Sequence, residues 1–298
     1  MDKTIIFALP GNKRLTRDLA NKLHLEEGEL TIKKFPDGES YVRIHSRVKA
    51  KRVILVCTLN NPDKKMLPLM FAAQTLKELG AKKISLISPY LPYMRQDKRF
   101  KPGEAISAHL FAKCLSNWVD YLITIDPHLH RVHQLSSIYS IPVLTLHATQ
   151  VIAQWIKANI KSPFLIGPDR ESEQWVSEVA EQLKAPYIVC RKNRLSAHEV
   201  TIEIPPFSHT DETLIILDDI ISTGSSMAAI LNQLSLQGHQ GICLAIHPLL
   251  NQKTKANLFA SGAAAIITCN TISDSTNQIN IVDLIAANLK NILEQDEL

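Results

Sequence analysis

The sequence lacks the features that would point to a membrane-spanning, secreted or nucleic-acid-binding protein. No apolar run is long enough to cross a bilayer, and no secretory signal is evident. The 298 residues carry a net charge of only +4, which by itself argues for neither a nucleic acid nor a membrane partner. Cys-x-x-Cys pairs are absent, and the five cysteines are widely spaced and odd in number. We therefore expect buried free thiols and a cytoplasmic protein.

What the chain does have is a regular alternation of strand and helix patterns. Hydrophobic residues make up 45% and charged residues 21%, as in ordinary soluble globular proteins. Alternation of this kind predicts parallel sheets flanked by helices, an α/β fold. The expected core strands are 5–10, 52–59, 83–88 and 121–126 in the first half, and 164–168, 213–219, 241–247 and 264–269 in the second.

The order of these elements repeats along the chain. The corresponding residues are Ile5 and Phe164, Val53 and Leu214, Gly80 and Gly238, and Ile84 and Ile242, at nearly constant spacing. Each half also places a hairpin-like pair before its second core strand, at 30–44 and at 187–204. All α/β proteins alternate, but constant spacing favours duplication of one unit. We predict two domains, 1–143 and 144–298, each a mostly parallel sheet flanked by helices, packed together across a short hinge.

The segment 213–227 carries the strongest functional signal. A buried strand ends in two carboxylates, Asp218 and Asp219, and a helix begins near Met227. The turn between them holds Ser222, Thr223, Gly224, Ser225 and Ser226. A helix N-terminus lined with small residues binds phosphate, whereas carboxylates suit sugar hydroxyls or a hydrated cation. An ordinary capped turn is the alternative, but the whole pattern indicates a phosphorylated sugar.

The corresponding turn of the first half, 58–64, has neither the acidic pair nor a glycine. It is a degenerate phosphate loop. We therefore expect only the second half to bind a sugar phosphate.

The 218–226 segment resembles the phosphoribosyl diphosphate (PRPP) loop of type I phosphoribosyltransferases and of PRPP synthetases. The run Arg95-Gln96-Asp97-x-Arg99 resembles the synthetases alone. The similarity extends from Ile5 to 281–293, in five motifs that occur in order. It implies two tandem type I phosphoribosyltransferase-like domains. It also implies a ribose-phosphate diphosphokinase, which transfers the diphosphoryl group of ATP to the anomeric oxygen of ribose 5-phosphate and gives PRPP and AMP for nucleotide biosynthesis.

The tip of the first hairpin reads Phe35-Pro36-Asp37-Gly38-Glu39. Turn chemistry explains the proline and the glycine, but not the other three residues. An aromatic face beside two acceptors suits the exocyclic amine of adenine. In the synthetases a similar segment holds the adenine of ATP across a subunit boundary, so the resemblance implies ATP contacts at Phe35, Asp37 and Glu39 and a homo-oligomer.

Residues 95–101 form a basic loop at the end of a core strand of the first half. Such loops are often only solvated, but this edge is where α/β sheets bind ligands. Positive charge there can neutralise a triphosphate. The resemblance assigns Arg95 and Gln96 to the ATP phosphates and includes Asp97 in the same ATP-binding run.

Two residues are implied as ligands of Mg²⁺. His128 matches the histidine that the synthetases supply to MgATP, although Pro127 stands where the family generally has leucine. Asp169 matches a second magnesium-related carboxylate. The small residues that usually follow it are replaced by Arg170-Glu171-Ser172. His130 and His133 are interpreted as surface histidines, since their spacing fits no structural zinc site.

The second hairpin contains Lys192 and Arg194. A basic hairpin tip is often only solvated, but the synthetases have Lys-x-Arg in a flexible catalytic loop. By this resemblance both residues are catalytic and stabilise charge on the transferred group. Two alternatives remain open: a base phosphoribosyltransferase, and a non-catalytic regulatory homologue of the synthetase.

Overall fold

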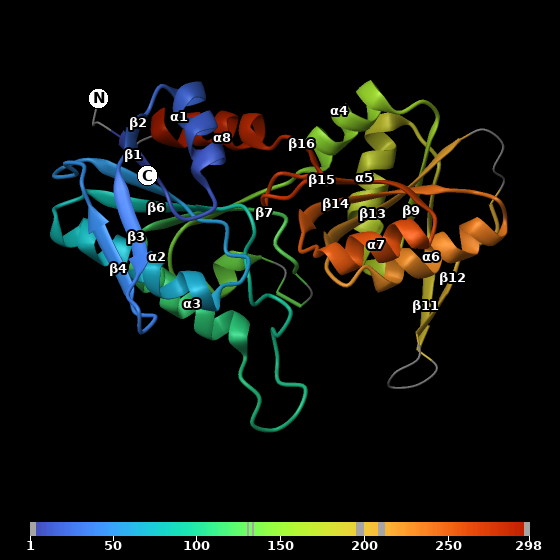
Figure 1. Ribbon diagram of the computed structural model, residues 1–298, viewed down its shortest axis with the longest axis horizontal. Coiled ribbons are helices and arrows are strands. Elements are labelled where there is room, and N and C mark those ends of the chain that lie inside the picture. Colours follow the sequence, from blue (N-terminus) through green and yellow to red (C-terminus); the bar gives the residue numbers. More distant parts are fainter. Residues whose placement is uncertain (1–3, 130, 133, 195–199, 208–211, 295–298) are drawn as a thin grey trace. The chain divides into compact units, whose positions relative to one another are not determined.

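The computed structural model describes residues 4–129, 131–132, 134–194, 200–207 and 212–294 (Figure 1). By its contacts the chain forms two compact units. The first unit consists of Met1–Leu146 and Val282–Leu298, and the second unit of His147–Ile281.

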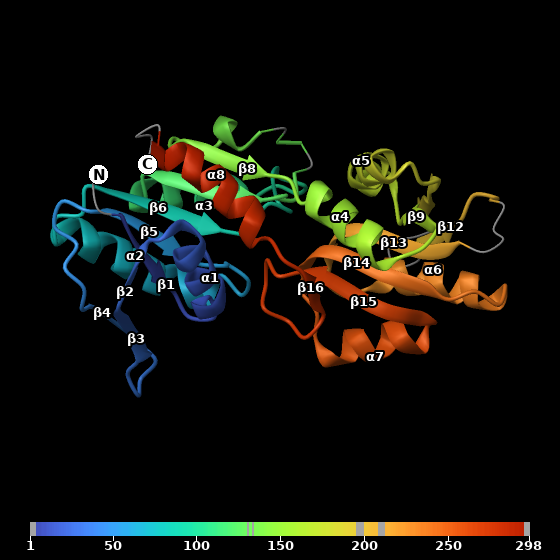
Figure 2. The same ribbon diagram turned by 90° about the horizontal axis from the view of Figure 1, so that it is seen from above.

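The first unit is built on a six-stranded parallel sheet in the order β2-β1-β5-β6-β7-β8. The strands are β1 (Thr4–Ala8), β2 (Glu26–Gly28), β5 (Arg52–Val56), β6 (Lys83–Ser88), β7 (Tyr121–Ile125) and β8 (Val143–Leu146). One face carries α1 (Lys13–Leu23) and α8 (Val282–Glu294); the other carries α2 (Asp63–Glu78) and α3 (Ser107–Trp118) (Figure 2). Every residue of β5 is buried because helices cover both faces of the sheet.

The second unit repeats this plan in the order β10-β9-β13-β14-β15-β16. Its strands are β9 (Pro163–Gly167), β10 (Tyr187–Val189), β13 (Thr213–Ile221), β14 (Gly241–Pro248), β15 (Ala263–Cys269) and β16 (Asn277–Ile279). Helices α4 (Thr149–Asn159) and α5 (Glu173–Leu183) cover one face, and α6 (Ser225–Leu236) and α7 (Gln252–Ala260) cover the other (Figure 1). The 3₁₀ helices are η1 (Leu135–Ser137) in the first unit and η2 (Arg170–Ser172) in the second.

Strand register supports the duplication. Ile5 pairs with Val53 in the first sheet, and their predicted counterparts Phe164 and Leu214 pair with each other in the second. At the next strand the correspondence shifts by one residue, because Ile242 pairs with Ile215 rather than with Leu214. The α/β fold and all eight predicted core strands are confirmed.

Two antiparallel hairpins stand apart from the sheets. The first joins β3 (Leu30–Lys34) to β4 (Ser40–Ile44), as predicted. The second joins β11 (Arg191–Arg194) to β12 (Val200–Glu203). It is shorter than the predicted 187–204, because β10 pairs with β9 in the main sheet instead.

The two units differ from the predicted domain limits at both junctions. Strand β8 extends the first sheet to Leu146, past the predicted boundary at 143. Helix α8 belongs with the first unit, where it packs against α1 and Lys22 Nζ lies 2.7 Å from Asp283 Oδ1. Its buried face includes Ile285 and Leu289. Among the described residues, no helix combines the length and apolarity needed to cross a bilayer.

Candidate active site

Three predicted acidic residues of the second unit lie at one edge of its sheet. Asp169 follows β9, while Asp218 and Asp219 lie in the second half of β13. These strands are parallel neighbours, so their carboxyl ends meet where α/β sheets bind ligands. Strand β13 runs on to Ile221, which places the acidic pair within the strand rather than at its predicted end.

The carboxylates of this edge repel one another. Asp218 is partly exposed, Asp219 is buried, and Asp218 Oδ1 accepts the Asp219 N–H at 3.0 Å. Burial raises the pKa of Asp218 well above its usual value, and the charges of Asp219 and Asp169 raise it further. A cation or a hydroxyl donor bound here would relieve that repulsion.

Lys192, from the second hairpin, reaches the same edge. Its Nζ lies 3.6 Å from Asp169 Oδ2. The other oxygen of that carboxylate caps η2 by accepting the N–H groups of Glu171 at 3.0 Å and Ser172 at 3.4 Å. The backbone of Arg194 lies in β11, but its side chain is outside the described residues. The structure thus brings Lys192, Asp169 and Asp218 together, although they are far apart in the sequence.

The hydroxyl-rich loop 222–226 ends at the first turn of α6. Gly224 has φ of +70°, and a Cβ there would lie 3.1 Å from Thr254 Cγ2, so glycine suits both the backbone and the space. Thr254, on α7, donates its hydroxyl to the Ser222 carbonyl at 3.2 Å. The hydroxyls of Thr223 and Ser225 lie 3.1 Å apart. Sequence reasoning missed Thr254, because nothing local links it to the loop.

In the first unit, Asp97 is part of an ion pair. Its side chain is only 2% exposed and accepts the Arg131 N–H at 2.9 Å and the Arg131 guanidinium at 3.0 Å. Burial alone would raise the pKa of Asp97, but the hydrogen bonds and charge of Arg131 outweigh it and lower the pKa. Asp97 therefore ties the basic loop to the segment after His128.

Glu104 organises the rest of the basic loop. Its Oε2 accepts the N–H groups of Phe100 at 2.8 Å and Lys101 at 3.0 Å, and lies 3.5 Å from Gln96 Nε2. Arg95 is exposed. Sequence reasoning missed both Glu104 and Arg131; a carboxylate within a basic run was the only available signal for Glu104.

The tip of the first hairpin presents all three predicted residues to solvent. Phe35 is 46% exposed, and Asp37 and Glu39 are exposed as well. The turn is closed by Phe35 N–H to the Glu39 carbonyl at 2.8 Å and by Glu39 N–H to Asp37 Oδ1 at 3.1 Å. Phe35 packs edge-on against Tyr41 with ring centroids 5.8 Å apart.

His128 follows β7 and is partly exposed. Within the part of the chain that the structure describes, no group of three or more His, Cys, Asp or Glu side chains could hold a metal ion. His130 and His133 lie outside the described residues.

These features define a class: two units of phosphoribosyltransferase type, the second with a hydroxyl-rich loop at the start of a helix. Residues 4–118 match the sequence model of the N-terminal domain of ribose phosphate pyrophosphokinase, and residues 134–274 match that of the phosphoribosyl transferase domain. A crystal structure of phosphoribosylpyrophosphate synthetase from Mycobacterium smegmatis shares the fold, with a TM-score of 0.85 and 24% identity over 99% of this chain and 100% of that one.

Two curated relatives are ribose-phosphate pyrophosphokinases from archaea. The Saccharolobus solfataricus protein is 38% identical over 94% of this chain and 97% of its own length. The Methanosarcina acetivorans protein is 30% identical over 95% and 98%, respectively. The chain belongs to the ribose-phosphate pyrophosphokinase family.

The protein is accordingly an enzyme that transfers the diphosphoryl group of ATP to ribose 5-phosphate, giving PRPP and AMP. This function is favoured over both alternatives. A base phosphoribosyltransferase would not account for the match of residues 4–118 to the N-terminal domain of a pyrophosphokinase.

Proposed function

We propose that the acidic edge of the second sheet is where ribose 5-phosphate binds and reacts. The observation that carries this proposal is the convergence of Lys192, Asp169 and Asp218 beside the phosphate loop. No covalent intermediate is needed, because the anomeric oxygen attacks the β-phosphorus of ATP in line. Catalysis then consists of positioning and charge neutralisation.

The 222–226 loop holds the 5-phosphate. The first N–H groups of α6 lack partners within the helix and, together with the hydroxyls of Thr223 and Ser225, surround an anion. Asp218 and Asp219 accept hydrogen bonds from the ribose hydroxyls, which removes part of the repulsion between the two carboxylates.

Lys192 and Arg194 stabilise the charge that develops on the transferred group. Lys192 Nζ lies 3.6 Å from Asp169, and its side chain remains 44% exposed, so a phosphate oxygen could replace this long contact. Both residues come from a hairpin outside the sheet, as expected of an element that moves during the reaction cycle.

ATP is bound by the first-unit residues. Arg95 and Gln96 contact its phosphates, and Asp97 holds their loop in place through Arg131. Phe35, Asp37 and Glu39 receive the adenine of an ATP bound to a neighbouring chain, which makes the enzyme a homo-oligomer. The exposure of Phe35 supports this role, since its ring is accessible for stacking on a base.

Members of this family use Mg²⁺, and the residues here fit that ion. Mg²⁺ prefers oxygen ligands, keeps several waters and commonly binds through one or two carboxylates plus substrate phosphates. Asp169 of the second unit supplies such a carboxylate, and His128 of the first unit supplies an imidazole ligand. When bound, Mg²⁺ neutralises phosphate charge.

The thiols support a cytoplasmic location. All five cysteines are free; four are buried as expected, whereas Cys114 is exposed. Burial raises the pKa of Cys57, Cys190 and Cys243 to about 12, with a contribution from Asp169 at Cys190, so these thiols stay protonated at neutral pH. Buried, unpaired thiols are typical of proteins from a reducing compartment.

The test is AMP formation from ATP with and without ribose 5-phosphate. We expect AMP only when both substrates are present. Asp218→Ala should weaken ribose 5-phosphate binding and slow the reaction together, because the carboxylate acts on the ribose in both states. Normal ribose 5-phosphate affinity in Asp218→Ala would contradict the proposed site.

A further inference from the structure

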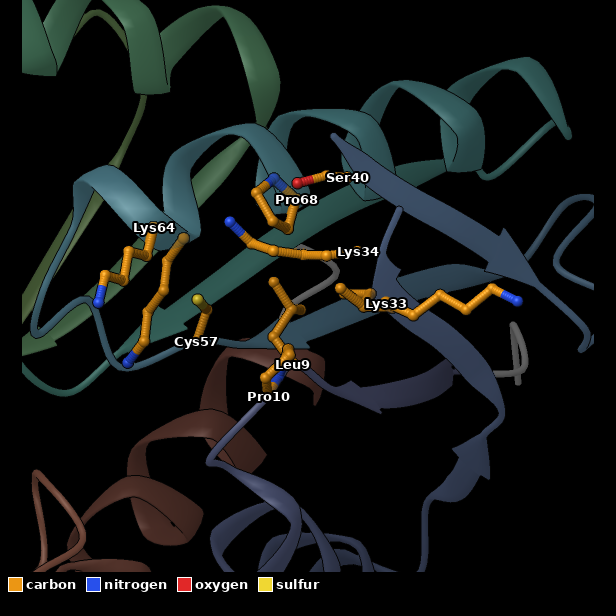
Figure 3. A pocket seen from close by; sticks show the side chains of 10 residues that line it. Leu9, Pro10, Lys33, Lys34, Ser40, Cys57, Lys64 and Pro68 are labelled. Atoms are coloured by element: carbon orange, nitrogen blue, oxygen red, sulfur yellow. The ribbon is translucent and has the colours of Figure 1, made fainter. Parts of the chain in front are cut away.

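The first unit contains a cavity of about 220 Å³ at the carboxyl ends of β1 and β5 (Figure 3). Its walls come from the end of β1, the first hairpin and the start of α2. Leu9, Ile32, Cys57 and Pro68 give it an apolar lining. This edge of the sheet corresponds to the edge that carries the phosphate loop in the second unit, because the strand order is the same.

The charge around the cavity is of one sign. Four of the ten described residues that line it are lysines and none is acidic. Burial lowers the pKa of Lys65, whose Nζ donates to the Thr58 carbonyl at 2.6 Å and to Asn60 Oδ1 at 2.5 Å. Lys33 lies over the Tyr41 ring and points away from the cavity (Figure 3).

The other two lysines are available to a ligand. Within the described residues, the side-chain ammonium groups of Lys34 and Lys64 have no hydrogen-bond or ion-pair partner. Lys34 extends across the cavity toward Pro68 (Figure 3). The carboxylate at the start of α2, Asp63, accepts a hydrogen bond from the Tyr93 hydroxyl instead.

Comparison with the second unit indicates what the cavity does not bind. Since Val53 corresponds to Leu214, Cys57 corresponds to Asp218 and Lys65 to Ser226. Burial keeps the Cys57 thiol neutral by raising its pKa to about 12, so it offers no charged acceptor for sugar hydroxyls. The ammonium of Lys65 is bonded to the turn after β5, where the other unit leaves its loop open.

We propose that this cavity binds a small organic phosphate whose body is apolar, at a site separate from the phosphate loop of the second unit. The apolar walls hold the body, and the ammonium groups of Lys34 and Lys64 hold the phosphate. A phosphate monoester carries close to two negative charges at neutral pH, which matches two lysines without partners. A ribose phosphate fits poorly, because its hydroxyls would face the apolar wall without partners.

The test follows the acetylation rate of each lysine by mass spectrometry, with phenyl phosphate as the probe and ribose 5-phosphate present at saturation to fill the phosphate loop. With phenyl phosphate at about ten times its Kd, acetylation of Lys34 and Lys64 should slow by roughly tenfold. Lys13 and Lys161, exposed lysines that are not among the residues lining the cavity, are the controls and should not change. Unchanged rates at Lys34 and Lys64 would overturn the proposal.

Three further ligands test the chemistry of the site. Inorganic phosphate lacks the ring of the probe and phenol lacks its phosphate, so each should slow the acetylation of Lys34 and Lys64 only weakly. Benzoate should slow it less than phenyl phosphate does. Equal protection by inorganic phosphate would show that the apolar wall contributes nothing. Equal protection by benzoate would show that the site does not select phosphate. Protection of the same lysines by ribose 5-phosphate alone would show that the site is not separate from substrate binding.

Substitutions give an independent measurement. Lys34→Met and Lys64→Met keep most of the side-chain bulk, and each should weaken phenyl phosphate binding by roughly tenfold in calorimetry, because one charge-assisted contact is lost. Lys13→Met should bind the probe as the wild type does. Wild-type affinity for phenyl phosphate in both Lys34→Met and Lys64→Met would contradict the proposed site, even if phenyl phosphate had changed the acetylation rates.

Discussion

At the scale of single residues, Asp169 divides its carboxylate between two partners. One oxygen caps η2 through the N–H groups of Glu171 and Ser172, and the other faces Lys192. The Ser172 hydroxyl completes the cap by donating to the Asp169 carbonyl at 2.6 Å. Residues 170–172, which replace the small residues usual in the synthetases, therefore restrain the orientation of Asp169.

Lys192→Ala should act on the chemical step. If the ammonium meets charge that develops only at the transition state, its loss should lower kcat by roughly a hundredfold, or about 3 kcal/mol, with both substrate affinities largely kept. Arg191→Ala is the matched control, because neighbouring side chains in β11 point to opposite faces. Near-normal kcat in Lys192→Ala would leave the second hairpin without a catalytic role.

Asp218→Asn should make the protein more stable and a poorer enzyme. The raised pKa of Asp218 means that its charged form is unfavourable in the folded state, so a neutral amide should raise Tm, by roughly 2–4 °C for each kcal/mol relieved. Ribose 5-phosphate should bind more weakly.

Asp274→Asn is the control for the effect of Asp218→Asn on Tm. Burial opposes the charge of Asp274, but hydrogen bonds from Lys255 and Thr276 outweigh it and lower its pKa. Asp274→Asn should therefore lower Tm. A fall in Tm for Asp218→Asn would mean that its carboxylate stabilises the fold rather than the bound sugar.

At the scale of elements, the two hairpins have different expected duties. Phe35→Ala should raise the KM for ATP by about tenfold, since a stacked base is worth about 1–3 kcal/mol, and should leave the affinity for ribose 5-phosphate unchanged. Phe71→Ala removes another exposed ring of the same unit, on α2, and serves as the control. Equal damage to both substrates would mean that the hairpin tip is structural.

The basic loop should show a pH-dependent contribution to stability. The folded-state pKa of Asp97 is lowered, so its charged form stabilises the folded protein. This contribution is fully present above the ordinary carboxyl pKa of about 4, and it is lost as pH falls through the folded-state pKa of Asp97. Asp97→Asn should cost about 1–2 kcal/mol in urea unfolding at neutral pH. That difference should shrink below about pH 4. A cost that does not depend on pH would rule out the Asp97–Arg131 ion pair as its source.

Long, apolar elements were predictable from the sequence, and short edge elements were not. Strands such as 52–56 are buried on both faces and leave an unbroken apolar run. Strands β2, β10 and β16 have three residues each, too few to show a period, and they form only because a neighbouring strand offers free hydrogen bonds. The same limit applied to the site: the motifs located Asp218 and Lys192, whereas Arg131 and Thr254 reach their partners only through the tertiary fold.

At the scale of the whole molecule, two units with the same strand order carry different groups at the same edge. We expect calorimetry to give one ribose 5-phosphate site per chain, because the first unit has Cys57 and Lys65 where the second has a carboxylate and a hydroxyl loop.

A loop variant identifies which unit holds that site. Gly224→Val should abolish it, since φ of +70° and the contact with Thr254 both oppose a side chain. Two equivalent sites in the wild type, or one remaining in Gly224→Val, would mean that the first unit binds the sugar as well.

The return of α8 to the first unit makes the second unit an insertion. The chain leaves the first unit after Leu146 and re-enters it at Val282, so residues 147–281 are tethered at both ends. A protease that cuts one junction leaves the two units covalently joined through the other. The first unit depends on the full length of the chain, because its last helix is synthesised after the whole insert. During translation the second unit can complete its sheet while the first still waits for α8 to cover α1.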